Sequence, residues 1–167
     1  FNGCTQLTSL DLSSFDTSLV TTMINMFTSC SSLKEIDISN FDISSVKTLS
    51  NMFNYCSKLE YINLNNSIEK SDVAINNDNM FLSMPINFVI CIDVNQNAKI
   101  SKSISKIAGA IVDCSNEWKL HQKKIVFGKD ELVNNCNETE NNKYEYEDIC
   151  YERCPNGTSL NNYSKWS

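Results

Sequence analysis

Apolar and polar residues alternate in three short stretches near the start of the chain, at residues 10–12, 36–38 and 62–64. Such alternation is typical of short strands that bury one face. After the first two stretches, apolar residues follow at the spacing of one helix face, over residues 20–30 and 46–56. The pattern therefore predicts a short strand followed by a short helix in each segment.

The same residue types return at a period of about 26 residues. From Phe1, Phe27 and Phe53 onward, the sequence follows the same pattern, F-x-x-C-x-x-L-x-x-[LI]-[DN]-[LI]-[SN]. One such unit cannot bury its apolar face alone, but copies stacked on one another can. We therefore predict an α/β repeat solenoid with one short strand plus one short helix in each 26-residue coil. Its predicted core consists of Leu10, Leu12, Phe15, Val20, Met23, Phe27, Leu33, Ile36, Ile38, Phe41, Val46, Met52, Phe53, Ile62 and Leu64.

The repeat pattern is lost towards the C-terminal part of the chain, and the changes in pattern predict three segments. Residues 1–94 carry the repeat, which begins inside a unit, so we expect this segment to be part of a longer chain. Residues 95–128 are predicted to form a C-terminal cap of helix and strand. The isoleucines that recur at helical spacing in this cap are Ile100, Ile104, Ile107 and Ile111. Residues 129–167 are acidic, polar and rich in cysteine, and are predicted to form a small, loop-rich tail.

Two sets of polar residues accompany the predicted helices. Asp16 and Asp42 stand just before them and are interpreted as caps that accept hydrogen bonds from free N–H groups. Asn25, Asn51 and Asn79 recur inside the repeats. We expect them to form a buried column that satisfies backbone groups of the loops.

A third polar column is formed by Asp11, Asp37 and Asn63, which occupy one position of each alternating stretch. We expect their side chains to point outward from the strands as a partly acidic row. Two carboxylates on neighbouring strands, about 5 Å apart, suit calcium binding or acid–base chemistry. A solvated strand face is the simpler interpretation. Because partners dock on the repeated face of such arrays, this row is the candidate binding surface.

Eight cysteines in 167 residues favour an oxidising compartment. Cys4, Cys30 and Cys56 form a column of three that cannot pair completely, and we interpret them as small buried apolar residues that stay reduced. Cys91 and Cys114 are predicted to form a disulfide between the last strand of the repeats and the end of the cap helix. The disulfide candidates are Cys91, Cys114, Cys136, Cys150 and Cys154.

Composition argues against several kinds of partner and site. A net charge of −6 argues against a nucleic-acid partner, and no apolar run is long enough to span a membrane. With His121 as the only histidine and one closely spaced cysteine pair, no metal site is predicted. No cofactor is expected, because the four glycines form no phosphate-binding loop. The glycosylation candidates are Asn65, Asn137, Asn156 and Asn162.

Two stretches resemble known families. Residues 7–30, L-x-x-L-D-L-S-x-F-D-T-S-x-V-x-x-M-x-x-M-F-x-x-C, closely resemble the 26-residue surface-protein repeat of the BspA-like leucine-rich-repeat family, and the match extends over residues 1–64. This resemblance implies a leucine-rich-repeat-like, non-enzymatic, adhesin-like protein that is secreted or lies at the cell surface. Residues 150–158, C-x-x-x-C-P-x-G-T, look like a piece of a furin-like cysteine-rich extracellular repeat.

Three functions are open on the sequence. The favoured one is a non-catalytic binding or adhesion module, extracellular or at the cell surface, whose partner is a cell-surface or matrix protein or a glycan. The second is a structural spacer in a larger surface protein, with no ligand of its own. The third, an enzyme fragment, is disfavoured because the chain displays no recognisable catalytic motif.

Overall fold

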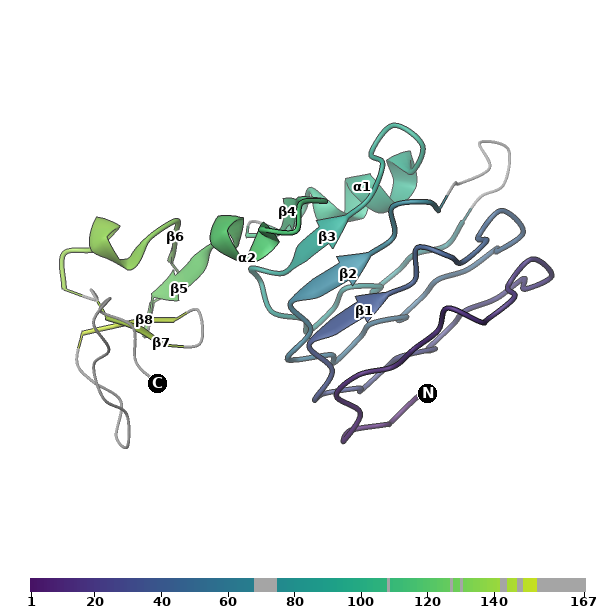
Figure 1. Ribbon diagram of the computed structural model, residues 1–167, viewed down its shortest axis with the longest axis horizontal. Coiled ribbons are helices and arrows are strands. Elements are labelled where there is room, and N and C mark those ends of the chain that lie inside the picture. Colours follow the sequence, from purple (N-terminus) through teal and green to yellow (C-terminus); the bar gives the residue numbers. More distant parts are fainter. Residues whose placement is uncertain are drawn as a thin grey trace. The chain divides into compact units, whose positions relative to one another are not determined.

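The computed structural model describes residues 1–67, 75–107, 109–126, 128–129, 131–141, 144–146 and 149–152. The chain divides into two compact units, Phe1–Asn116 and Glu117–Ser167 (Figure 1).

A parallel sheet organises the first unit. Its strands are β1 (Glu35–Asp37), β2 (Tyr61–Asn63), β3 (Val89–Cys91) and β4 (Ile111–Val112), in the order β1-β2-β3-β4. Ile36 pairs with Ile62 and Ile62 with Ile90, so equivalent positions of successive repeats lie side by side. All three isoleucines are buried, because alternate residues of a strand point to the same face.

The predicted helices of the repeats are absent from the structure. Residues 20–30 and 46–56 consist of turns and short bridges, and the described residues contain two α-helices, α1 (Ala98–Ile104) and α2 (Trp118–His121). The predicted repeat solenoid, with a strand and a helix in each coil, is therefore wrong. It is replaced by a small, disulfide-containing α/β arrangement of a parallel four-stranded sheet and a second four-stranded sheet.

Hydrogen bonding explains why turns replace the helices. The N–H of Phe27 donates to the carbonyl of Met52 in the next repeat (2.9 Å), whereas the N–H of Cys30 closes a turn onto the carbonyl of Phe27 (3.1 Å). N–H groups thus alternate between the neighbouring repeat and the local turn. Asn25 and Asn51 have a φ of 57°, in the left-handed region that interrupts a helix and that asparagine tolerates.

The two polar sets expected around these helices have other roles. Asp16 Oδ1 accepts a hydrogen bond from the N–H of Ser18 (3.0 Å), and Asp42 Oδ1 accepts one from the N–H of Ser44 (2.8 Å). These are side-chain-to-backbone turns, which use the same chemistry as a helix cap. The asparagine column is not buried: Asn25 and Asn51 are half-buried and Asn79 is exposed.

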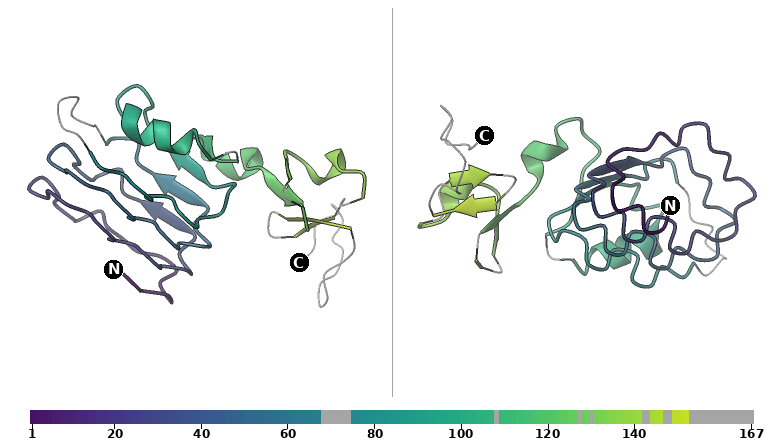
Figure 2. Two further views of the ribbon diagram at one scale, coloured as in Figure 1. Left: turned by 180° about the vertical axis from the view of Figure 1, so that it is seen from behind. Right: turned by 90° about the horizontal axis from the view of Figure 1, so that it is seen from below.

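The backbone segments of successive repeats lie over one another in the first unit (Figure 2). A column of stacked phenylalanine rings runs through its core. Ring centroids of Phe1 and Phe27, and of Phe27 and Phe53, are 5.6 Å apart with nearly parallel planes. Most of the predicted core is buried, and Leu10 and Val20 are partly buried. The prediction is wrong for Phe15, which is 43% exposed because it lies in the outermost repeat.

Helix α1 connects the parallel strands β3 and β4. Ile100 and Ile104 on this helix are buried in the core. The predicted isoleucine stripe is longer than the helix, since α1 ends at Ile104 and Ile111 begins β4. The segment that follows the repeats therefore adds a fourth strand to the sheet.

The described part of the second unit contains a mixed sheet and a disulfide. Strand β5 (Lys124–Val126) lies between an antiparallel β6 (Leu132–Val133) and a parallel β8 (Ile149–Tyr151). Strand β7 (Tyr144–Tyr146) pairs antiparallel with β8. Its small core includes the disulfide between Cys136 and Cys150. Lys124 is buried and its Nζ lies 3.4 Å from a carboxylate oxygen of Glu145. The 3-10 helix η1 (Cys136–Glu138) comes between β6 and β7 in the chain.

Candidate functional site

The outward face of strands β1 and β2 brings two of the predicted binding residues together. Asp37 and Asn63 are paired in register, and Asn63 Nδ2 donates a hydrogen bond to Asp37 Oδ2 (3.1 Å). On the same face, Glu35 is paired with Tyr61. We call Glu35, Asp37, Tyr61 and Asn63 the sheet row.

Backbone turns hold the predicted residues in place. Asp37 Oδ1 accepts a hydrogen bond from the N–H of Ser39 (2.9 Å), and Asn63 Oδ1 accepts one from the N–H of Asn65 (3.1 Å). Asp11, the third predicted residue, makes the same turn with Ser13 in the first repeat (3.0 Å). Residues around Asp11 form no named strand, so Asp11 is oriented locally rather than by the sheet.

The electrostatics of the row centre on Asp37 and Tyr61. Burial raises the pKa of Asp37, but hydrogen bonds from Ser39 and Asn63 outweigh it and hold the pKa below its usual value. Burial also raises the pKa of the Tyr61 phenol, and the charges of Asp37, Asp113 and Glu35 raise it further. Three carboxylates thus act on one half-buried aromatic ring.

Tyr61, Glu35 and Asp113 are site residues that sequence reasoning missed. Glu35 and Tyr61 lie two positions before Asp37 and Asn63. Because alternate residues of a strand point to the same face, this spacing could have placed Glu35 and Tyr61 beside the predicted residues. Asp113 follows strand β4, which was predicted as part of a helix. No signal in the sequence placed it near Tyr61.

The row ends at a disulfide. Cys91 is paired in register with Asn63 and is bonded to Cys114, with an S–S distance of 2.07 Å. The sequence predicts the same pairing. Cys91 and its neighbour Val89 are buried, so the accessible part of the face lies over β1 and β2.

The repeat cysteines form a column of free thiols. Cys30 Sγ donates to the carbonyl of Phe1 (3.2 Å), and Cys56 Sγ donates to the carbonyl of Phe27 (3.0 Å). Burial raises the pKa of Cys56 to about 12 and also raises that of Cys30. Because the thiolate is the reactive form, neither buried thiol is suited to nucleophilic chemistry.

The remaining predicted sites are distributed as follows. Asn65 and Asn137 are exposed, as a glycosylated asparagine must be. Cys136 and Cys150 are joined to each other. Cys154, Asn156 and Asn162 lie outside the described residues.

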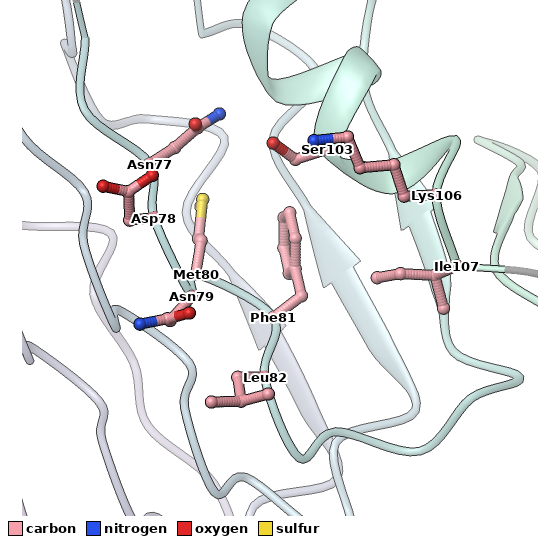
Figure 3. A pocket seen from close by; sticks show the side chains of 9 residues that line it. All are labelled: Asn77, Asp78, Asn79, Met80, Phe81, Leu82, Ser103, Lys106 and Ile107. Carbon is pink, nitrogen blue, oxygen red and sulfur yellow. The ribbon is translucent and has the colours of Figure 1, made fainter.

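A pocket of about 410 Å³ opens between residues 77–82 and the end of helix α1 with the residues that follow it (Figure 3). Met80 and Phe81 contribute apolar surface, and Asp78 and Lys106 bring one charge of each sign from its two sides. Ser103 on α1 donates its hydroxyl to the carbonyl of Lys99 at 3.5 Å, within the helix. The pocket lining contains neither histidine nor cysteine, so it offers polar and apolar contacts but no activated nucleophile.

Metal-binding clusters and membrane-spanning helices are both absent from the described part of the chain. In that part, no group of three histidine, cysteine or acidic side chains is placed to hold a metal ion. None of its helices has the length and apolar character needed to cross a membrane.

The comparisons with known proteins give one match. Residues 1–103 match the model of a family described as Mycoplasma protein of unknown function, DUF285. No curated protein matches the chain. No solved structure matches it either. Since the matched part comprises more than half of the chain and includes both β1 and β2, the protein belongs to the DUF285 family.

Proposed function

We propose that the protein is a non-catalytic binding module that acts outside the cell or at its surface, and that it binds through the sheet row. The observation that carries this proposal is the hydrogen bond between Asn63 and Asp37 on paired strands. It fixes polar side chains of two repeats at the spacing of neighbouring strands, so a partner meets an ordered set of contacts.

The chemistry of the row favours a cationic partner. Glu35 lies opposite the half-buried Tyr61 on the neighbouring strand, and Asp37 lies two positions further along that strand. The charges of both carboxylates, and that of Asp113, act on the Tyr61 phenol. A lysine or arginine side chain can pair with the carboxylates and lie over the ring. The partner is therefore a lysine- or arginine-rich segment of a cell-surface or matrix protein.

Location outside the cell is supported by the cysteines. Cys91–Cys114 and Cys136–Cys150 are both bonded, and disulfides persist in oxidising compartments. The resemblance of residues 7–30 to the BspA-like surface repeat, and of residues 150–158 to furin-like repeats, favours the same location and an adhesin-like role. A spacer without a ligand is the alternative, and it requires no binding by the row.

Reversing the charge of the sheet row distinguishes the binding module from the spacer. The double variant Glu35→Lys/Asp37→Lys changes the row from acidic to basic, whereas Glu131→Lys/Glu140→Lys makes the same change in net charge at exposed positions of the second unit. Binding of each folded protein to an immobilised lysine- and arginine-rich peptide is measured. We expect the row variant to lose at least about tenfold in affinity, which corresponds to 1.4 kcal/mol, and the control to lose much less. Equal losses for both variants, or no binding by the parent protein, would support the spacer.

A further inference from the structure

The pocket beside α1 carries an unpaired charge on each of its two sides. Asp78 stands in residues 77–82 on one side, and Lys106 follows α1 on the other. Both side chains are exposed, and neither has a hydrogen-bond or ion-pair partner among the described residues. Figure 3 shows Met80 and Phe81 between them. A ligand that pairs with both charges therefore carries a cationic group at one end and an anionic group at the other.

Two main-chain donors on the Asp78 side of the pocket are also unpaired. The carbonyls of Asp78 and Met80 accept hydrogen bonds of 3.0 Å from N–H groups of the preceding repeat. In a planar trans peptide bond, the N–H points away from the carbonyl of the same bond. The N–H groups of Asn79 and Phe81 therefore point away from the preceding repeat, and both residues line the pocket. Neither N–H donates to an acceptor among the described residues.

The spacing of these two donors matches an extended peptide. The neighbouring carbonyls of Asn77 and Asn79 are engaged in turns, where they accept from the N–H groups of Met80 and Leu82 at 3.2 and 3.1 Å. The donors of Asn79 and Phe81 are thus left for water or for the oxygens of a ligand. In an extended peptide, the carbonyls of alternate residues point to the same side. One such peptide can therefore meet two N–H groups that lie two residues apart.

The floor of the pocket is apolar. Met80 is 1% exposed and Phe81 is 7% exposed, and Leu82 and Ile107 add apolar surface at the margins. The volume of about 410 Å³ falls within the range of about 300–1,000 Å³ that is typical of small-ligand sites. This size suits a peptide of about three residues with apolar side chains, and not a long segment.

We propose that this pocket binds a short peptide of about three residues with both termini free and at least one apolar side chain. The terminal ammonium pairs with Asp78, and the terminal carboxylate pairs with Lys106. The carbonyl of the first residue and the carboxylate of the last accept hydrogen bonds from Asn79 and Phe81, and the apolar side chain lies on Met80. The site is separate from the sheet row and does not depend on the function proposed for it.

Peptides with blocked termini and variants without the charges test each end of the site. The probe is the tripeptide leucyl-alanyl-leucine, titrated into the full chain in a calorimeter, together with its N-acetylated and C-amidated forms. We expect each blocked form to bind at least about tenfold more weakly than the free tripeptide, because it lacks one charge pair. Asp78→Asn should lose the same factor for the free tripeptide and lose nothing further for the N-acetylated form. Lys106→Met should behave in the same way towards the C-amidated form.

Lys102→Met is the matched control, because Lys102 is exposed on α1 but does not line the pocket. It should bind all three peptides as the parent protein does. Hydrogen exchange of the Asn79 and Phe81 amides gives a second measurement. A saturating amount of the free tripeptide should slow their exchange at least about tenfold, because both N–H groups then have acceptors.

Four results would overturn the proposal. The absence of both heat and amide shifts at about 5 mM tripeptide would show that the pocket takes no peptide. Equal affinity for the free and blocked forms would show that the two charges do not select the termini. Free leucine that binds as tightly as the tripeptide would assign the site to a single amino acid. A loss in Lys102→Met equal to that in Lys106→Met would place the binding elsewhere on α1.

Discussion

Asn63 donates a hydrogen bond of 3.1 Å to Asp37, which lies 26 residues earlier and directly opposite on the neighbouring strand. An amide at one position and a carboxylate at the other avoid repulsion between two like charges. Changing Asn63→Asp places two carboxylates opposite each other, which destabilises a strand pair by about 0.5 kcal/mol. We expect urea unfolding at pH 7 to show this loss at low salt and to show less of it in 1 M salt, because exposed charges are screened. Asn63→Ala, which removes the hydrogen bond without adding charge, should show no such dependence on salt.

Acid should destabilise the first unit through its turn-forming aspartates. Hydrogen bonds from Ser13 to Asp11 and from Ser18 to Asp16 lower the pKa of these carboxyls, and the pKa of Asp37 is lowered as well. A carboxyl whose pKa is lower in the folded state contributes stability above its unfolded pKa, about 4. That stability is lost as the pH falls through the folded pKa. Thermal unfolding between pH 7 and pH 2 should therefore show a falling midpoint below about pH 4. A midpoint that stays level or rises in that range contradicts the role of these turns.

The phenylalanine column gives a sharp contrast in stability. Phe27 is fully buried and stacked on both sides, whereas Phe15 is 43% exposed. Phe27→Ala should cost about 3–5 kcal/mol, as large-to-small changes in a core do. Phe15→Ala should cost much less, because much of its side chain already contacts water. Denaturant unfolding of both variants measures the two values. Similar losses would contradict the burial of one ring and not the other.

The three free cysteines should differ in reactivity. Burial raises the pKa of Cys56 to about 12 and raises that of Cys30, while Cys4 is exposed. In the native protein at pH 8, we expect a maleimide to label Cys4 first and the two buried thiols far more slowly. Peptide mapping identifies the labelled cysteine, and labelling in denaturant provides the control in which all three react. Early labelling of Cys56 would mean that the repeats are not packed as described.

Side-chain pattern and backbone geometry differ in how well a sequence reveals them. The apolar positions of Ile36 and Ile62 predicted short strands with one buried face, because alternation reports directly on a strand. The predicted helices were wrong because turns whose hydrogen bonds join residues three positions apart produce the same apolar spacing as a helix. The left-handed φ of Ser29 and Tyr55 has no clear signal, since neither residue type is typical of that region.

Part of the candidate site could also be predicted from the sequence, because side-chain patterns report on strands. The period of the repeat places equivalent residues on neighbouring strands. It therefore predicts that Asp37 and Asn63 lie next to each other. Asp113 approaches Tyr61 through a fourth strand, β4, whose two residues continued an isoleucine spacing typical of a helix. Contacts that depend on such a connection are set by tertiary packing and not by the local pattern.

The most direct test of the sheet row is a titration of isotope-labelled protein with a lysine- and arginine-rich peptide, followed by amide chemical shifts. If the row is the binding face, the largest shifts fall on Glu35, Asp37, Tyr61 and Asn63, and they disappear in Glu35→Lys/Asp37→Lys. Shifts that instead cluster around the pocket beside α1, or on the acidic residues of the second unit, would contradict binding through the row.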